Sequence, residues 1–166
     1  PLLNNIKRLK ISNNKINKIE NINKNIEILE IDNNNLTECD FSNYNLLNRL
    51  IIFTNPITKI KLGKFIKYID LSETGVTELD DIYNVEDLVL NNCPNIKNLP
   101  KSDILKNLEL INTPIEKLYF YKNYMLIIVQ LNMTKNISSK YKNDNANIQI
   151  RQNRFIVISK ENIPIE

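Results

Sequence analysis

The stretch IKRLKISNNKI (Ile6–Ile16) decides the fold of this chain, because its apolar skeleton returns twenty residues later in IEILEIDNNNL (Ile26–Leu36). In both stretches apolar residues stand at positions one, four, six and eleven, and an asparagine stands at position nine. Similarity at a fixed period predicts a repeat architecture, in which each unit buries its apolar face against its neighbours. The frame continues to give seven copies, offset by 19 to 21 residues, that begin at Ile6, Ile26, Leu47, Ile66, Val85, Leu105 and Leu126.

Each copy contains a short segment in which apolar residues alternate with others, such as Arg8–Ser12. A period of two is typical of a β-strand, and stacked units of this kind are expected to form a continuous parallel sheet. Position nine lies where the chain turns out of the strand, so its side chain must satisfy backbone groups inside the solenoid. Asparagine does this best, which predicts a less rigid C-terminal half. These ladder residues are Asn14, Asn34, Asn55, Thr74, Cys93, Thr113 and Thr134.

A second apolar set follows each ladder residue, for example Leu36, Cys39 and Phe41, and is expected to close the opposite side. Residues 1–166 are predicted to form one domain of about seven repeats, with an irregular unit at 138–166. Pro1 stands five residues before the first copy, so the chain is expected to begin within a repeat. Two strands compete in the last unit, and both together could end the sheet.

Little in the sequence indicates catalysis. There is no histidine, which removes the usual general base and the commonest metal ligand. The two glycines are too few for a phosphate-binding loop. No enzyme activity, cofactor or metal is therefore expected. Cys39 and Cys93 lie three units apart, about 14 Å by strand spacing, which is too far for a disulfide. Two buried, unpaired cysteines favour an intracellular, cytoplasmic location. This prediction includes the cytoplasm of a host cell.

The charge is nearly balanced, with 22 basic and 19 acidic residues and a net charge of +3. No nucleic-acid or membrane partner is expected from this balance. A basic cluster near the start of the sequence is followed directly by acidic residues, which favours a solvated surface over a nucleic-acid site. The basic residues are Lys7, Arg8 and Lys10 with Lys15 and Lys18, and the acidic ones are Glu20, Glu27, Glu30 and Asp32.

The outward strand positions are free to carry function, because the repeat fixes the buried ones. On the middle strands they include several apolar side chains, which we expect to form a centre that charged residues surround. A protein-binding patch is the favoured interpretation. The alternatives are that an isoleucine-rich composition places isoleucine everywhere, or that a loop covers the patch. The predicted partner-binding residues are Ile28, Arg49, Ile51, Phe53, Tyr68, Asp70, Val89, Glu109 and Ile111.

Seven copies in phase, one of them a cysteine variant with an extra residue after Cys93, resemble the leucine-rich-repeat family. The resemblance implies a right-handed horseshoe of α/β type. One parallel β-sheet would line the concave face, and extended or 3₁₀ segments would form the convex side. The short, irregular repeats resemble those of large A/T-rich DNA viruses, insect poxviruses included, and those of bacterial effectors. Only Leu99–Pro100 matches the Leu-Pro pair of the effector repeats.

Leucine-rich repeats are mostly protein-recognition scaffolds, so the resemblance implies a monomeric module that binds a partner protein through the concave sheet. Two alternatives stay open. The chain could be the substrate-recognition arm of a larger enzyme such as a ubiquitin ligase, or a structural array that assembles with itself.

Overall fold

The computed structural model describes residues 5–79, 82–100, 102 and 104–115 in full, and the backbone alone of three strands beyond them. The described residues contain strands, turns and extended segments, and no helix. The strands are β1 (Arg8–Lys10), β2 (Ile28–Glu30), β3 (Glu38–Asp40), β4 (Arg49–Ile51), β5 (Lys59–Lys61), β6 (Tyr68–Asp70), β7 (Asp87–Val89), β8 (Asn107–Ile111), β9 (Leu126–Gln130), β10 (Ala146–Arg151) and β11 (Arg154–Ser159).

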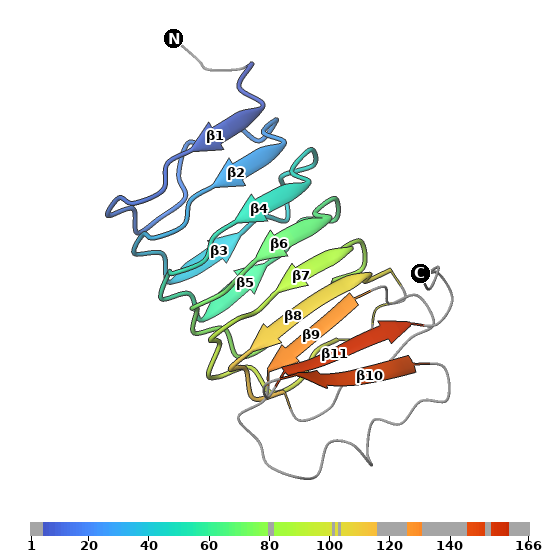
Figure 1. Cartoon of the computed structure of the whole chain (residues 1–166). Coiled ribbons are helices and arrows are strands. Elements are labelled where there is room, and N and C mark those ends of the chain that lie inside the picture. Colours follow the sequence, from blue (N-terminus) through green and yellow to red (C-terminus); the bar gives the residue numbers. More distant parts are fainter. Residues whose placement is uncertain are drawn as a thin grey trace.

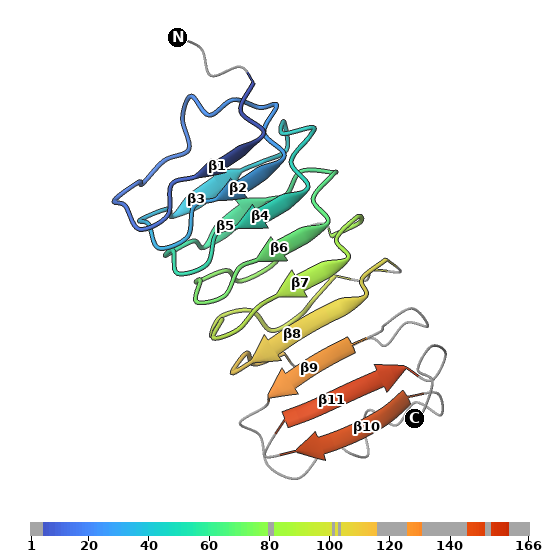
Figure 2. The same ribbon diagram turned by 45° about the horizontal axis from the view of Figure 1, so that its top comes forward.

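The chain forms a β-solenoid of about five turns, each about 20 residues long. One strand of every coil joins a nine-stranded main sheet in the order β1-β2-β4-β6-β7-β8-β9-β11-β10 (Figures 1 and 2). The strands from β1 to β9 are parallel, and the register pairs the same position of successive copies, as in Arg8 with Ile28 and Ile28 with Arg49. The repeat frame is therefore confirmed from the first copy to the sixth, and so is the parallel sheet that these copies form.

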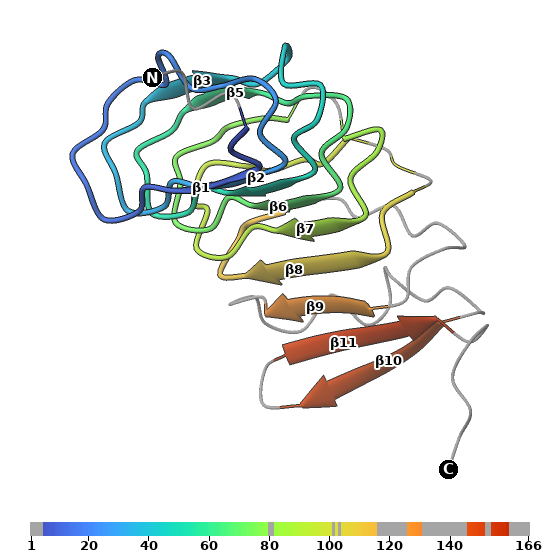
Figure 3. The ribbon, with the colours of Figure 1, turned by 90° about the horizontal axis from the view of Figure 1, so that it is seen from above.

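The side of the coil opposite the main sheet is extended, as the short repeat predicts. β3 and β5 pair there as a separate two-stranded parallel sheet, across the coil from the main sheet (Figure 3). No 3₁₀ segment occurs in the part of the chain that the structure describes. The α/β description is accordingly replaced by that of a β-solenoid, because coils of about 20 residues leave no length for a helix between strands.

The core fills the inside of the coils with the two predicted apolar sets. Leu29, Leu50 and Ile69 from the main sheet have no exposed surface, and neither do Leu36 and Phe41 from the opposite side. In the first coil the equivalent residues are only partly buried, because one neighbouring coil covers them instead of two. The partly buried residues of this coil are Leu9, Ile11, Ile16, Ile19 and Ile22.

The asparagine ladder joins each coil to the one before it. The side-chain Nδ2 of Asn34 donates to the carbonyls of Ile31 and Asp32 in its own coil and to Ile11 in the preceding coil, at 3.0 to 3.1 Å. Its Oδ1 accepts the amide of Ile16, also in the preceding coil, at 3.0 Å. Asn55 repeats all four bonds one coil further on. Both side chains are buried.

Later ladder residues make fewer bonds, as predicted. The Thr74 hydroxyl donates to the Leu71 carbonyl at 2.7 Å and contacts the Cys93 sulfur at 3.8 Å. The Cys93 thiol in turn donates to Leu71 at 3.1 Å. The Thr113 hydroxyl donates to the Leu90 carbonyl of the preceding coil and accepts the Cys93 amide at 3.2 Å. Whether fewer bonds make this half less rigid stays a prediction.

The residue before each of the first six ladder positions, those that the structure describes, adopts a left-handed backbone conformation, with φ between 51° and 60°. Asparagine tolerates this conformation better than most residues, and it occupies four of the six positions. The side chains also bond between coils, as in Asn33 to Asn13 at 2.6 Å and Asn112 to Asn92 at 2.9 Å. The six residues are Asn13, Asn33, Thr54, Glu73, Asn92 and Asn112.

The seventh copy departs from the predicted frame by two residues. The sequence frame aligns Gln130 with Glu109, whereas the structure pairs Ile128 with Glu109 and Gln130 with Ile111. Beyond β9 the sheet changes direction, because β11 pairs antiparallel with β9 and β10 pairs antiparallel with β11. Both competing strands of the last unit therefore exist, and the main sheet is mixed and not purely parallel.

Candidate interaction surface

All nine predicted partner-binding residues lie on the face of the main sheet that points away from the core, which we call the outer face. Each outer residue stands next to a buried one, so that β4, β6 and β7 all read half-buried, buried, half-buried. The register places the nine on five strands or directly after them. By strand they are Ile28 on β2; Arg49, Ile51 and Phe53 on or after β4; Tyr68 and Asp70 on β6; Val89 on β7; Glu109 and Ile111 on β8.

The apolar residues of the outer face are not contiguous, which corrects the predicted arrangement. Asp70 was expected to be one of the charged residues at the edge of an apolar centre. The register instead places Asp70 between Ile51 and Val89, directly opposite both. The surface is therefore a mosaic of apolar and acidic side chains, with the carboxylate inside the patch.

Arg49 and Tyr68 form a stacked pair at the middle of this surface. They are directly opposite one another on β4 and β6, and the Arg49 guanidinium carbon lies 3.6 Å from the centre of the Tyr68 ring. This geometry is that of a cation–π contact. Burial, together with the nearby Asp70 carboxylate, raises the pKa of the Tyr68 hydroxyl. The pair places a cation over an aromatic ring on the outer face, and the Tyr68 hydroxyl is neutral at pH 7.

Three carboxylates follow on β6, β7 and β8, and their hydrogen-bond partners are neutral. Asp70 accepts the amide of Ser72 at 3.0 Å, Asp87 accepts the side chain of Asn107, and Glu109 accepts the side chain of Asn91 at 3.0 Å. Among the described residues, no lysine or arginine lies within 4.0 Å of these three carboxylates. This part of the outer face is therefore acidic.

Asp87 was not among the predicted residues, and the structure adds it to the surface. An open hollow of about 400 Å³ extends from β4 to β8, with Arg49, Tyr68, Asp87, Val89 and Glu109 among its lining residues. Asp87 occupies the same strand position as Arg49 and Tyr68. The repeat frame could have found it, because that position is outward in every copy.

The other end of the outer face is occupied by an ion cluster. Glu30 accepts from Arg8 and lies 2.9 Å from the Lys10 amine, and the two cations leave its side chain 8% exposed. These bonds, from Lys10 first and then Arg8, lower the pKa of Glu30. Lys7 pairs with Glu27 at 2.7 Å. The basic cluster near the start of the sequence is thus engaged within the protein, as the charge pattern favours.

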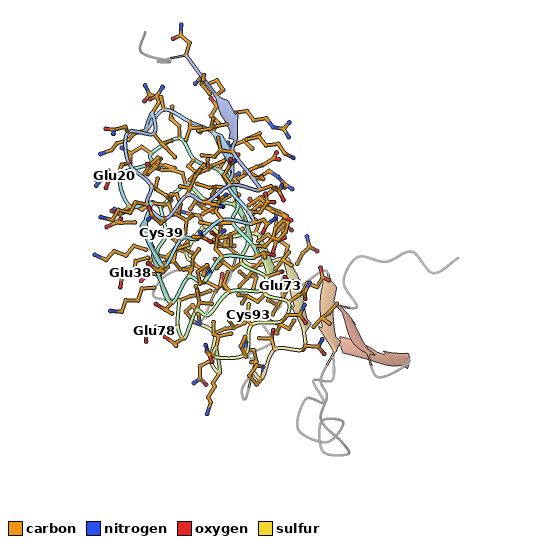
Figure 4. The ribbon with its side chains drawn as sticks, turned by 90° about the vertical axis from the view of Figure 1, so that its left-hand side faces the viewer. Glu20, Glu38, Cys39, Glu73, Glu78 and Cys93 are labelled. Atoms are coloured by element: carbon orange, nitrogen blue, oxygen red, sulfur yellow. The ribbon has the colours of Figure 1, made fainter. Side chains whose placement is uncertain are left out.

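The two cysteines lie apart, buried and unpaired, as predicted (Figure 4). Burial raises the pKa of the Cys39 thiol to about 12 and also raises that of Cys93. Cys39 is among the residues that line a second open hollow, about 370 Å³, on the β3–β5 side. A thiol with so high a pKa is a poor nucleophile at neutral pH.

The described residues hold no group of three or more histidine, cysteine, aspartate or glutamate side chains arranged to bind a metal ion. Within the same part of the chain, no helix has the length and apolar character needed to cross a membrane.

The fold and the outer face define a parallel β-solenoid with coils of about 20 residues. Comparison with protein-family models, with curated proteins and with solved structures finds no significant match to this chain.

Proposed function

We propose that the chain is a leucine-rich-repeat module that binds a partner protein through the outer face of the main sheet. In this proposal the outer face is the concave side of a horseshoe. The repeat skeleton, the coil length and the ladder support assignment to the leucine-rich-repeat family. The short irregular repeats support an origin like that of large A/T-rich DNA viruses or of bacterial effectors, acting inside a host cell.

One observation carries the binding proposal: apolar, aromatic and charged side chains alternate on the outer face while the core behind them is already complete. Ile51, Phe53 and Val89 are half-buried although they contribute nothing to the interior. Arg49 and Tyr68 add a stacked aromatic platform beside them. Aromatic residues and arginine are enriched where proteins bind each other. Binding is proposed in preference to catalysis because the sequence contains no histidine, the most frequent general base.

The test is capture of a partner from host-cell lysate by this chain and by a triple variant of the outer face, Ile51→Glu, Phe53→Glu and Val89→Glu. A matched control places three glutamates on the opposite side, with Thr37→Glu, Thr58→Glu and Thr77→Glu, at equivalent exposed positions of three coils. Circular dichroism must show all three proteins equally folded. We expect one protein to be captured by the unmodified chain and the control and lost by the outer-face variant. Equal capture by all three would reject the outer face as the binding surface.

A further inference from the structure

We infer that the outer face over β6, β7 and β8 recognises a segment of the partner protein that carries a lysine or arginine next to an apolar residue. This inference rests on the proposed function and specifies the chemistry of the partner. It follows from the mosaic of carboxylates and apolar side chains, which the linear sequence does not display.

The carboxylates supply the preference for a cation. Asp70, Asp87 and Glu109 belong to three adjacent parallel strands, which are spaced about 4.8 Å apart. No two of them are directly opposite, because Asp70 faces Val89 and Asp87 faces Tyr68 and Asn107. They are diagonal or next-but-one neighbours on one face, and their hydrogen-bond donors are neutral, so the negative charge of this region is not compensated. A cation from a partner would compensate it. The acidic face is thus complementary to a basic segment.

The lysines nearest to this surface are already engaged. Lys67 lies 3.4 Å from Glu86, and Lys106 also pairs with Glu86. Lys67 directly precedes β6, and Lys106 directly precedes β8. The pKa of Lys106 is raised by its bond to Glu86 and also by the negative charge of Asp87. They border the hollow and do not fill it, so the positions over Asp87 and Glu109 stay open to a partner's side chain.

The hollow also fits an apolar neighbour. Val89 lines it beside Asp87 and Glu109, and Ile111 follows Glu109 on the same face. Arg49 lines the β4 end of the hollow and covers one side of the Tyr68 ring. Its charge repels a second cation there, which limits the basic side chain to the region of β7 and β8. A nucleic acid or an anionic membrane is disfavoured, because its phosphates would meet these carboxylates.

The test uses two synthetic peptides as probes, acetyl-Leu-Arg-Leu-Lys-Leu-amide and acetyl-Leu-Glu-Leu-Gln-Leu-amide. Each is titrated into the ¹⁵N-labelled full chain at 150 mM salt, and amide chemical shifts report the affinity and the site. Two double variants are compared with the unmodified chain. One carries Asp87→Asn and Glu109→Gln on the outer face, and the control carries Glu38→Gln and Glu78→Gln on the opposite side. Both pairs remove two negative charges, so total charge is matched.

We expect the basic peptide to bind at least about tenfold more tightly than the acidic one and to shift the amides of β6, β7 and β8. The Asp87/Glu109 variant should lose most of that preference, and the control pair should keep it. Equal affinities, no binding, shifts elsewhere, or the same loss in both variants would each overturn the inference. Capture of a partner through the outer face would then still stand, because its test does not depend on the carboxylates.

Discussion

The side-chain amide of Asn55 donates to the carbonyl of Ile31, 3.1 Å away in the preceding coil. The same side chain satisfies two carbonyls of its own coil and one amide of the coil before. One buried residue therefore holds two coils in register.

Replacing Asn55 by alanine is expected to destabilise the solenoid by at least about 2 kcal/mol, because it leaves buried carbonyls and an amide without partners. Thr74→Ala removes a single strong bond and should cost about 1 kcal/mol. The measurement is urea unfolding followed by circular dichroism. Asn45→Ala, at an exposed position, is the control. If Asn55→Ala and Asn45→Ala unfold at the same urea concentration, the ladder does not stabilise the stack.

Thr54→Asn is expected to stabilise the protein by about 1 kcal/mol. Thr54 has a φ of 51°, which a β-branched side chain adopts at a cost that asparagine largely avoids. The melting temperature of the variant should rise. Thr77→Asn makes the same chemical change where φ is not positive, and should change stability by less than about 0.5 kcal/mol. Equal effects of both substitutions would show that backbone strain at Thr54 is not the cause.

The two glycines provide a matched pair of packing tests. A Cβ at Gly63 would lie 2.7 Å from the Phe41 carbonyl oxygen of the preceding coil, whereas one at Gly75 would lie 3.3 Å from the Ile57 oxygen. Gly63→Ala must therefore move backbone apart and should cost about 2 kcal/mol in unfolding free energy. Gly75→Ala should cost clearly less. The reverse order, measured by urea unfolding, would contradict this account of coil spacing.

Glu30→Gln tests the ion cluster through its pH dependence. Lys10 and Arg8 lower the pKa of Glu30 in the folded state, so its ionised form stabilises folding above the unfolded pKa, near 4.5. That stability is lost as pH falls through the folded pKa. The variant should be about 1 kcal/mol less stable than the parent at pH 7 and equal to it in strong acid. Glu78→Gln serves as the control, and a pH-independent difference for Glu30→Gln would rule out the ion pairs as its cause.

Cys39 should resist alkylation in the folded protein. A pKa of about 12 leaves about a thousandfold less thiolate at pH 8 than a pKa of 9 does. Iodoacetamide labelling, followed by mass spectrometry of the Cys93→Ser variant, should be more than about a hundredfold slower in buffer than in 8 M urea. Rapid labelling in buffer would show that Cys39 is not buried in solution.

The sequence predicts the strands, the ladder and the outward positions because every coil must satisfy the same backbone groups in the same way. It fails in the seventh copy, where Leu126, Ile127, Ile128 and Val129 are all apolar and no alternation fixes the register. The left-handed positions were also missed. The sequence frame gives no role to asparagines such as Asn13 and Asn33, whereas the structure places them in a left-handed backbone conformation.

The surface was predicted residue by residue but not as a pattern. The outward positions of Ile51, Asp70 and Val89 follow from the frame, yet their direct opposition requires the strands to be placed side by side. Asp70 lies between Ile51 and Val89, so these two apolar side chains do not form a continuous apolar centre.

β11 pairs antiparallel with β9, and β10 pairs antiparallel with β11, so the last two strands are not coils of the parallel repeat. The number of coils can therefore change while the arrangement of these last strands stays the same. Each ladder bond reaches back by one coil only, so a gene segment that encodes one coil, from one ladder residue to the next, could be duplicated or lost without disturbing the others. The antiparallel pair of β10 and β11 would then pair with whichever parallel strand came last. Coil number is then a quantity that evolution can change in whole steps, and the width of the outer face changes with it by about 4.8 Å per step.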